Sequence, residues 1–372
     1  MPHHSIVSVV LSIVAASTAF HAQGKVERAP VTNGSGRENV EVFTLTNDHG
    51  LQARAMTWGA TLIGMKVPDR EGKLADITLG FDDPARYLQP HPLFGSIAGR
   101  YANRIARGRF ELDGKMFQLP TNNGVNHIHG GMKGFDQRNW TGEPVGDNAV
   151  RFRYVSPDGE EGYPGELNVS VTYTLTNDDE LRIAYEAETT APTILNLTNH
   201  SYWNLAGKGD VLSHELAING GMVNEVDEGM IPTGTFHELD EGPLDFRKAK
   251  PIGRDIRETP ASIGGYDHCY VITHSPNGTL GESTLAATLH DPASGRTMKV
   301  WTDQPAVQLY TANHLKDLKG RAGQVYGRHA GVCLETQHFP DSPNHPDFPS
   351  TVLRPGETFR TTTVFAFSAG KD

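Results

Sequence analysis

A histidine lies in the middle of residues 194–205, which read ILNLTNHSYWNL. Successive side chains of a strand point to opposite faces, so this alternating run predicts a strand with one buried face and one wet face. The buried face would hold Leu195, Leu197, Trp203 and Leu205, and the wet face would hold Asn196, Thr198, His200, Tyr202 and Asn204. A histidine on a wet face is either an ordinary surface residue or a group that transfers protons in a site.

A glutamate interrupts a second apolar run, GVCLETQHF at residues 331–339. Val332 and Leu334 would lie on the face opposite to Glu335, so its carboxylate is either exposed at a sheet edge or placed in a cavity. A histidine and a glutamate on separate strands can act as a general acid and a general base. His200 and Glu335 are therefore the candidate pair for proton transfer.

Two segments supply nitrogen donors. GRYANRIARGRF concentrates four arginines around Asn103, and the planar fork of Arg104 suits vicinal hydroxyls or a carboxylate. NHIHGG would place His127 and His129 on the same face of a strand, a spacing that also occurs in zinc sites. No third ligand lies nearby in the sequence, so a metal is not expected.

Two further segments supply oxygen acceptors and an amide. GGYDHCYVI presents Asp267 at the entrance of an apolar strand, and AVQLYTANH places Gln308 and Tyr310 on one face. Polar side chains of these kinds, with aromatic rings and without a phosphate-binding loop or a metal motif, indicate a hydroxyl-rich small ligand. We expect no cofactor.

The elements that must position these side chains are predicted to be short antiparallel strands. Turn sequences separate alternating segments: NDHG separates VEVFTLT from LQARAM, NDDE separates LNVSVTYTLT from LRIAYEAET, and PASG separates TLAATLHD from RTMKVWTD. This spacing is typical of an antiparallel sandwich or barrel, and the 40 glycines and 23 prolines fit a turn-rich chain. Only PARYLQ and DIRETPASI are expected to form short helical turns. We predict one large all-β domain over residues 39–370.

The charge of the chain excludes some partners. Its 33 Lys and Arg residues against 44 Asp and Glu residues give a net charge of −11, and no basic run stands out. Nucleic acid and anionic membrane are therefore not expected as partners. The expected partner is a small molecule, and the protein is expected to be a monomer or a homodimer.

The N-terminus resembles a secretory signal. Residues 6–20 form an apolar run without a charge, followed by small residues, which predicts a signal peptide over residues 1–22 with cleavage after Ala19 or Ala22. The mature protein would then be periplasmic or secreted, and a cytoplasmic location is the alternative. Residues 23–38 are predicted to be a flexible leader.

The two cysteines, Cys269 and Cys333, lie inside apolar strand-like runs. An exported protein could join them in a disulfide, but geometry that the sequence does not give would have to permit it. We expect free buried thiols.

Eight segments, in order, resemble the aldose 1-epimerase (galactose mutarotase) family: GRYANRI, NHIHGG, GFDQRNW, NLTNHSYWNLAG, GPLDFR, GYDHCY, CLETQHFPDSPN and LRPGETF. The match covers about residues 40–368, which is nearly the whole mature chain. The resemblance implies a large antiparallel β-sandwich, the galactose mutarotase-like supersandwich. It also implies an enzyme that interconverts the α and β anomers of free aldoses without a cofactor.

The resemblance also implies roles for single residues. His200 resembles the family's general acid and Glu335 its general base. Ser201 and Tyr202 adjoin the acid and are expected to shape its pocket. The positions that match sugar-binding residues are Asn103, Arg104, His129, Asp267 and Gln308.

Opening a pyranose ring requires removal of the C1 hydroxyl proton and protonation of the ring oxygen. We expect Glu335 to take the first proton and His200, as an imidazolium, to supply the second. His129 and Arg104 could stabilise charge on the oxygen atoms, and Asp267 with Asn103 could orient the hydroxyls. These protonation states predict a bell-shaped pH dependence.

Three alternative functions use similar residues. A hexose-6-phosphate 1-epimerase of the same fold would use the extra arginines near Arg104 as phosphate ligands. A non-catalytic carbohydrate-binding sandwich would not need both Glu335 and His200. A glycosidase would need paired carboxylates, for which only Glu335 and Asp267 are available.

Overall fold

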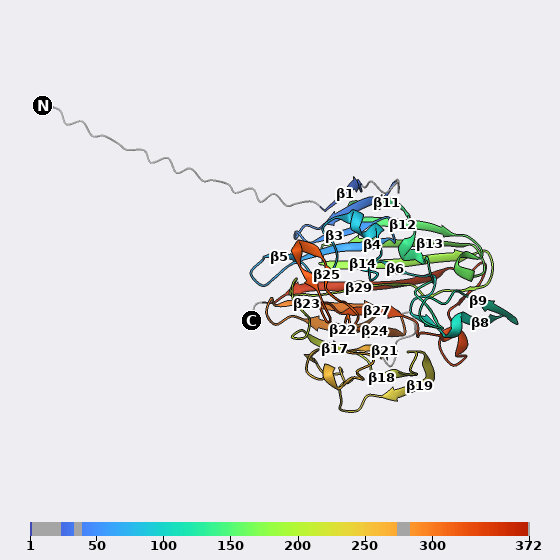
Figure 1. Cartoon of the computed structure of the whole chain (residues 1–372). Coiled ribbons are helices and arrows are strands. Elements are labelled where there is room, and N and C mark those ends of the chain that lie inside the picture. The colour runs from blue at the N-terminus through green and yellow to red at the C-terminus, as the bar shows by residue number, and fades with distance from the viewer. Residues whose placement is uncertain (2–23, 33–38, 274–282, 371–372) are drawn as a thin grey trace.

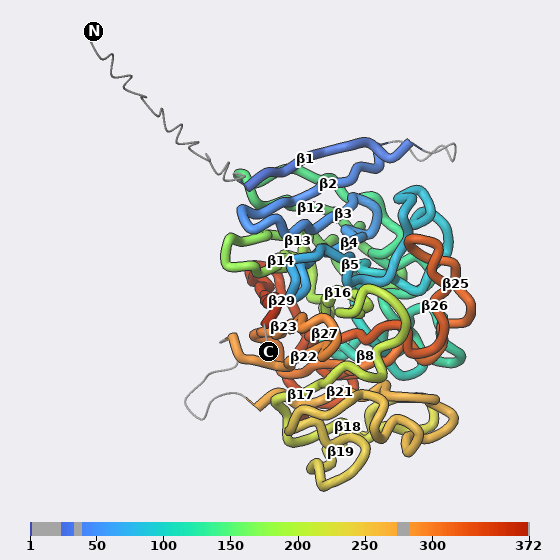
Figure 2. Tube along the Cα trace, turned by 90° about the vertical axis from the view of Figure 1, so that its left-hand side faces the viewer, coloured from blue at the N-terminus to red at the C-terminus, as the bar shows by residue number. Residues whose placement is uncertain are grey.

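Three antiparallel sheets contain most of the strands (Figure 1). The computed structural model describes residue 1 and residues 24–32, 39–273 and 283–370. The regular elements in these ranges are strands and 3-10 helices of five residues or fewer. Figure 2 shows the strands following one another across the molecule, from β1 at one end to β18 and β19 at the other.

The strands of each sheet come from distant parts of the chain. The N-terminal sheet has the order β1 (Lys25–Pro30), β2 (Glu41–Thr46), β3 (Gln52–Met56), β4 (Thr61–Pro68) and β5 (Leu74–Asp76). The nine-stranded sheet has the order β11 (Thr141–Val145), β12 (Ala149–Ser156), β13 (Leu167–Leu175), β14 (Glu180–Thr189), β29 (Phe359–Ala369), β23 (Arg296–Thr302), β22 (Thr284–His290), β17 (Glu215–Ile218) and β20 (Lys250–Pro251). The third sheet, here called the pocket sheet, has the order β19 (Pro232–Glu238), β18 (Met222–Val226), β21 (Asp267–Val271), β24 (Ala306–Tyr310) and β27 (Cys333–Gln337).

Short strand pairs and 3-10 helices connect the sheets. The pairs are β6 (Ile97–Ala98) with β16 (Thr198–Asn199), β7 (Arg104–Ile105) with β10 (His127–Ile128), β8 (Arg109–Leu112) with β9 (Lys115–Gln118), β15 (Thr193–Ile194) with β28 (Val352–Leu353), and β25 (Leu318–Lys319) with β26 (Val325–Tyr326). The 3-10 helices are Pro84–Leu88, Ala106–Gly108, Phe135–Gln137, Glu160–Gly162, Ile256–Glu258, Arg321–Gly323 and Ser342–Asn344.

One apolar core contacts all three sheets. It includes Phe43 of the N-terminal sheet, Tyr173 and Phe365 of the nine-stranded sheet, and Leu309 of the pocket sheet, all of them almost fully buried. Trp203 lies among them, with its ring centroid 4.8 Å from that of Phe365. Because apolar burial contributes about 25 cal/mol per Å², large rings of this kind supply much of the free energy that holds the sheets together.

The predicted hairpins are confirmed. β2 pairs with β3, β13 with β14, and β22 with β23, each in antiparallel register across the predicted turn. Alternation is clearest in β13, where every second side chain is buried. The helical turns expected at PARYLQ and DIRETPASI are the 3-10 helices Pro84–Leu88 and Ile256–Glu258.

The predicted leader over residues 23–38 is wrong at Lys25–Pro30, which form β1 and pair with β2. This strand carries little apolar surface, and Val26 is its side chain that packs against the core. Its backbone instead pairs with the backbone N–H and C=O groups at the edge of β2. Arg28 also makes two hydrogen bonds to the carboxylate of Glu41. Alternation of side chains does not reveal a strand that is held by its backbone. The predicted signal peptide lies outside the described residues, except for residue 1.

The predicted single strand over residues 194–205 is also wrong. The segment is irregular, and β15 and β16 account for three of its residues, Ile194, Thr198 and Asn199. Its apolar side chains lie in the core as predicted. Among the polar ones, Asn196 donates to the carbonyl oxygen of Ala102 and Asn204 to that of Ala330, so both hold neighbouring backbone instead of facing solvent.

Both cysteines are free and buried, as expected. Cys269 lies on β21 and Cys333 on β27, and β24 separates these strands. Neighbouring strands lie about 4.8 Å apart, so strands two places apart exceed the roughly 7 Å over which a disulfide can form.

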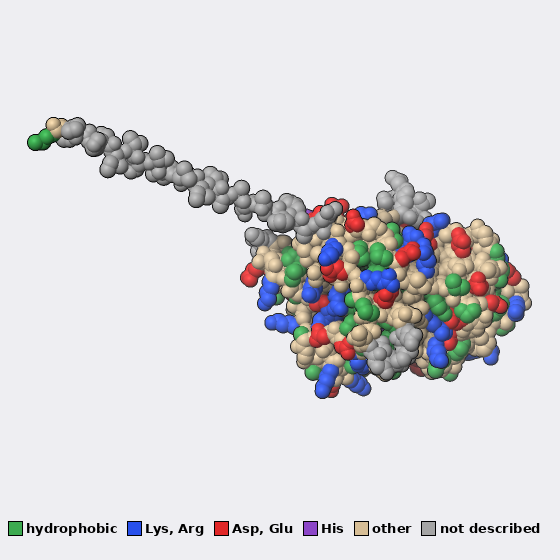
Figure 3. All heavy atoms as spheres, turned by 90° about the horizontal axis from the view of Figure 1, so that it is seen from above, with side chains coloured by type: hydrophobic (Ala, Val, Ile, Leu, Met, Phe, Trp, Pro, Cys, Tyr) green, Lys and Arg blue, Asp and Glu red, His purple; other side chains and the backbone are tan. Residues whose placement is uncertain are grey.

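The described surface shows no concentration of one charge on the face drawn in Figure 3, where acidic and basic side chains are interspersed. No helix among the described residues is long and apolar enough to cross a membrane.

Candidate active site

One face of the pocket sheet lines a pocket of about 210 Å³. Glu335 on β27 lies directly opposite Gln308 on β24, and Asp267 on β21 lies opposite Tyr310 in the next row. Directly opposed residues of an antiparallel sheet share a face, so three strands bring these side chains together. The lining residues are Pro92, Leu93, Asn103, Arg104, Asn123, Ile128, His129, His200, Tyr202, Asp267, Gln308, Tyr310, His314 and Glu335.

His200 enters the pocket from the segment that follows β16. Its backbone N–H donates to the carbonyl oxygen of Ser96, and its own carbonyl oxygen accepts from the N–H of Gly95. The ring stacks on that of Tyr202, with centroids 5.1 Å apart. Nε2 of His200 lies 3.6 Å from Oε1 of Glu335, and the two residues are 5% and 2% exposed. The candidate acid and base therefore face each other in a nearly dry site.

His129 and Asn103 are fixed by each other. The N–H of Asn103 donates to Nδ1 of His129 at 3.1 Å, and the N–H of His129 donates to the carbonyl oxygen of Asn103 at 3.1 Å. Both residues have positive φ, 62° for Asn103 and 50° for His129, a conformation uncommon for residues other than glycine. Such strain is found where the surroundings impose a geometry, as at ligand sites.

A series of polar contacts links the pocket residues Gln308, Asp267, Arg104 and Asn123. Nε2 of Gln308 donates to Oδ1 of Asp267 at 2.6 Å, and Asp267 forms an ion pair with Arg104 at 3.8 Å. Arg104 also donates from Nε to Oδ1 of Asn123. These contacts hold an acceptor, an amide and a guanidinium in fixed positions around the pocket.

Burial shifts the pKa of both proton-transfer candidates. It raises the pKa of Glu335 to about 8, the charge of Asp267 adding to the rise and Arg104 opposing it. It lowers the pKa of His200 to about 4. The expected reactive state is an imidazolium beside a carboxylate, whereas these shifts place the proton on Glu335 of the free pocket. Between about pH 4 and pH 8 the pair holds one proton, which either residue can carry.

A metal fits this donor set poorly. Ligand atoms of His129, His200 and Glu335 all lie within 4.8 Å of one another, which is a spacing that could hold a cation. Nδ1 of His129, however, already accepts the N–H of Asn103. Burial lowers the pKa of His129 well below its usual value, so the neutral ring carries its proton on Nε2. Neither nitrogen has a free lone pair for a metal, and Nε2–H suits an oxygen acceptor.

Two buried oxygen atoms in the pocket have no hydrogen-bond partner within the described ranges, Oε2 of Glu335 and Oε1 of Gln308. An unpartnered buried polar atom costs about 1–3 kcal/mol, so such atoms are rare in finished interiors. Both atoms belong to residues that line the pocket, where hydroxyl groups of a ligand would satisfy them.

The structure brings together eight of the nine predicted site residues, and Ser201 is the exception. Its hydroxyl donates to Oδ1 of Asn199, and it is not among the residues that line the pocket. The expected shared face of His127 and His129 is also wrong. His127 lies in the interior, with its ring nitrogens 2.8 Å from the carbonyl oxygen of Pro120 and 2.6 Å from the hydroxyl of Tyr163.

Several lining residues are not among the predicted site residues. Pro92 and Leu93 come from the loop that follows the 3-10 helix Pro84–Leu88, and Asn123 and His314 come from other loops. Loop residues carry no periodic signal, so only the three-dimensional fold identifies them. Tyr310 was detectable, because its alternation with Gln308 predicts the shared face that the structure confirms.

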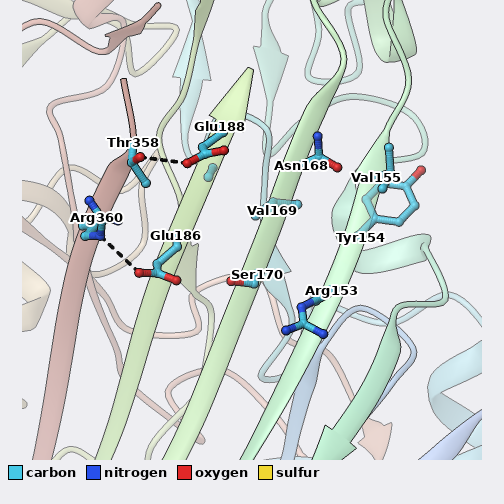
Figure 4. A pocket seen from close by; sticks show the side chains of 11 residues that line it. Arg153, Tyr154, Val155, Asn168, Val169, Ser170, Glu186, Glu188, Thr358 and Arg360 are labelled. Atoms are coloured by element: carbon cyan, nitrogen blue, oxygen red, sulfur yellow. Dashed lines mark hydrogen bonds and ion pairs between the residues drawn. The ribbon is translucent and has the colours of Figure 1, made fainter. Parts of the chain in front are cut away.

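A second hollow of about 250 Å³ lies on the nine-stranded sheet, across β12, β13, β14 and β29 (Figure 4). Its charged side chains have partners: Nε of Arg360 lies 3.1 Å from Oε1 of Glu186, and the hydroxyl of Thr358 donates to Glu188 at 2.9 Å. Arg153 forms an ion pair with Glu143, which lies outside the hollow. This hollow, here called the sheet groove, contains none of the predicted site residues.

Comparisons with known proteins agree with this arrangement. A family model for aldose 1-epimerase matches residues 41–366. Galactose mutarotase of Rattus norvegicus is 47% identical over 337 residues, which are 90% of this chain and 96% of the rat protein. Aldose 1-epimerase of Escherichia coli strain K12 is 36% identical over 333 residues, covering 88% of this chain and 95% of that protein.

Solved structures share the fold. The crystal structure of an aldose epimerase homologue from C. elegans superposes with a TM-score of 0.81 at 30% identity and covers 87% of this chain and 97% of that one. Galactose 1-epimerase from Lactobacillus acidophilus also gives a TM-score of 0.81, at 29% identity, covering 94% of this chain and all of that one. The fold is thus that of the sugar epimerases. The chain belongs to the aldose 1-epimerase family of isomerases.

Proposed function

We propose that the protein interconverts the α and β anomers of free aldohexoses such as D-glucose and D-galactose. The main observation behind this proposal is the buried pair of His200 and Glu335. Nε2 of His200 lies 3.6 Å from Oε1 of Glu335, in a pocket of monosaccharide size that is lined by hydrogen-bonding groups. Family membership supports the same reaction. No residue of the proposed mechanism requires a cofactor.

The reaction moves two protons and breaks one bond. Glu335, as a carboxylate, takes the proton of the C1 hydroxyl, and the electrons of that O–H bond form the C1 carbonyl. The bond between C1 and the ring oxygen breaks, and Nε2 of His200 gives its proton to that oxygen. Rotation about C1–C2 turns the other face of the aldehyde to the oxygen, and closure reverses both transfers.

Burial strengthens the Glu335 carboxylate as a base and the His200 imidazolium as an acid, and it also makes this charged pair the minor form of the free pocket. A buried carboxylate is a stronger base and a buried imidazolium a stronger acid, because neutralisation removes a poorly solvated charge. Ring opening converts the charged pair into the neutral pair that the free pocket favours. The buried site therefore drives both proton transfers in the direction that forms the open-chain aldehyde.

The other pocket residues orient the sugar. His129, whose Nε2 carries a proton, is a fixed donor for an oxygen atom, and Arg104 is a second donor beside Asp267. Asp267 and Gln308 offer acceptors for hydroxyls, and Tyr202 stacks on the acid. Fixed hydroxyl contacts hold C1 against the pair, which contributes through orientation.

Polarimetry on freshly dissolved single anomers tests the proposal. We expect the wild-type protein to accelerate the change in rotation of α-D-glucose and α-D-galactose, and His200→Asn to lose most of this acceleration, by about 10²–10⁴-fold. Sugar binding by calorimetry without acceleration would favour the non-catalytic alternative. Release of reducing sugar from a glycoside would favour a glycosidase.

The positions of the arginines give little support to the alternative function of a hexose-6-phosphate 1-epimerase. Arg104 is the arginine that lines the pocket, and it is paired with Asp267. Arg100 is buried and donates to the hydroxyl of Ser156 and to four backbone carbonyl oxygens, while Arg107 and Arg109 are exposed outside the pocket. We therefore expect free glucose to be a better substrate than glucose 6-phosphate in the same assay.

We also propose that residues 39–370 form one domain and that the protein is exported, with a cytoplasmic location as the alternative. Cleavage after Ala19 or Ala22 would leave β1 in the mature chain, because β1 begins at Lys25. N-terminal sequencing of protein recovered from fractionated cells tests this: a mature chain that begins at residue 20 or 23 outside the cytoplasm supports export, and an intact N-terminus in the cytoplasm overturns it.

A further inference from the structure

Cys333 contacts the candidate acid on the side away from the base. Its Sγ lies 3.7 Å from Nδ1 of His200, while Nε2 of the same ring faces Glu335. We infer that Cys333 is a positioning residue that accepts a hydrogen bond from the Nδ1–H of His200 and so keeps Nε2 as the nitrogen that exchanges a proton with the sugar. This inference rests on the proposed role of His200.

The position of Cys333 follows from the register of the pocket sheet. Cys333 and Glu335 are two residues apart on β27, so their side chains leave the strand on the same face. Cys333 also lies directly opposite Tyr310, which lines the pocket. One strand therefore supplies both the base and the group that orients the acid, and the distance between them is fixed by the strand itself.

The proton balance decides the direction of this hydrogen bond. An imidazolium carries protons on both nitrogens. After Nε2 has given its proton to the ring oxygen, the remaining proton must stay on Nδ1, or Nε2 could not take a proton back on closure. A buried N–H needs an acceptor, and the sulfur of Cys333, which is fully buried, is at hydrogen-bond distance.

The two pocket histidines thus have opposite tautomers. Nδ1 of His129 accepts the backbone N–H of Asn103, which puts the ring proton on Nε2 and makes His129 a permanent donor. Nδ1 of His200 faces sulfur, which has lone pairs to offer, and its Nε2 is left to gain and lose a proton. The partner of Nδ1 separates a binding histidine from a proton-transferring one.

A thiol suits this position because it is a weak, neutral acceptor. A carboxylate there would stabilise the imidazolium and make it a weaker acid. Burial raises the pKa of the Cys333 thiol well above its usual value, so the sulfur stays uncharged. The acid can then keep the low pKa that burial gives it. Other titratable groups near the ring are His91, His129, Tyr202, Tyr310 and Glu335.

The test combines kinetics with a direct measurement of the tautomer. In Cys333→Ala we expect kcat to fall by about 3- to 10-fold, the worth of one hydrogen bond, with KM unchanged. In Cys333→Ser the hydroxyl restores the acceptor, so most of kcat returns, and as a stronger acceptor it moves the acid limb of the pH profile upward. Nitrogen-15 NMR of His200 should show the proton on Nδ1 in the wild type and in Cys333→Ser, and a shift toward Nε2 in Cys333→Ala.

Cys269→Ala is the matched control, because Cys269 is also a buried thiol of the pocket sheet but does not line the pocket. It should leave kcat and the spectrum of His200 unchanged. An unchanged tautomer and pH profile in Cys333→Ala would overturn the inference. If Cys333→Ala does not fold, the upward shift of the acid limb in Cys333→Ser decides alone. Lack of turnover by the wild type would refute the proposed function, whereas the NMR measurement would still test the hydrogen bond.

Discussion

The pocket and the sheet groove use polar side chains in opposite ways. In the groove, Arg360 pairs with Glu186 and Thr358 with Glu188, and the side chains of Arg360 and Glu186 are 66% and 52% exposed (Figure 4). In the pocket, His200 and Glu335 are almost fully buried, and one oxygen of Glu335 has no partner among the described residues. The two hollows are similar in volume, so size does not distinguish them.

The pocket and the sheet groove differ in whether their polar side-chain atoms have hydrogen-bond partners within the protein. Exposed pairs satisfy each other in water and cost the fold nothing, and they contribute about 0–1 kcal/mol each. A buried carboxyl oxygen without a partner, such as Oε2 of Glu335, costs folding free energy, because it is neither solvated nor hydrogen-bonded. We conclude that the pocket carries a cost that only a bound ligand offsets, which is why chemistry is expected there and not in the groove.

The largest expected effect comes from removing the base. Glu335→Gln keeps the shape of the side chain but cannot take the C1 hydroxyl proton, so kcat should fall by about 10²–10⁴-fold with a small change in KM. Stopped-flow polarimetry measures this change. A variant that kept near-normal kcat would show that Glu335 is not the base.

The same substitution should raise stability near neutral pH. Burial raises the pKa of Glu335 from 4.5 to about 8, so the folded state binds its proton more tightly than the unfolded state. This group's contribution to stability is fully present below pH 4.5 and is lost as pH rises through 8, so wild-type stability falls across that range. Thermal unfolding should therefore show Glu335→Gln above the wild type at pH 8 and near it at pH 4.

The pH dependence of the wild type is the next largest effect. Below about pH 4 both His200 and Glu335 are protonated and no base remains, and above about pH 8 the pair loses its single proton and no acid remains. Below about pH 4 and above about pH 8, kcat should fall roughly tenfold per pH unit. Polarimetry corrected for spontaneous mutarotation would measure this fall. A flat profile from pH 3 to pH 10 would contradict the shared proton.

The sequence predicts the elements with strong local signals and misses those defined by distant partners. The hairpin of β13 and β14 follows from alternation and a turn, and the shared face of Gln308 and Tyr310 follows from spacing alone. β1 is held by the backbone of β2, and no side-chain pattern shows that.

The site divides in the same way. The resemblance to a family identifies residues that the structure brings into one pocket, but it cannot give a contact between residues 133 positions apart, such as that of Cys333 with His200. Ser201 adjoins the acid in the chain, and yet its hydroxyl binds Asn199, because neighbours in an extended segment point to different sides. Burial and its effect on pKa are likewise properties of the assembled core.

A smaller effect is expected from the guanidinium that borders the pocket. Arg104→Met removes a charged donor to the sugar and should raise KM by about tenfold, the value of one such hydrogen bond. It also removes the positive charge that lowers the pKa of Glu335, so the basic limb of the pH profile should move upward. Arg109→Met is the control, because Arg109 is exposed and binds Gln118 outside the pocket. An unchanged KM and an unchanged basic limb in Arg104→Met would remove Arg104 from the site.

The smallest effect is expected in the sheet groove. Arg360→Ala breaks the ion pair with Glu186, and because both side chains are more than half exposed, the free energy of unfolding in urea should change by about 0–1 kcal/mol. Polarimetric kcat and KM should equal those of the wild type, since the groove shares no lining residue with the pocket. A change in KM would mean that the groove takes part in sugar binding, and the contrast between paired and unpaired polar groups would then fail as a guide to function in this fold.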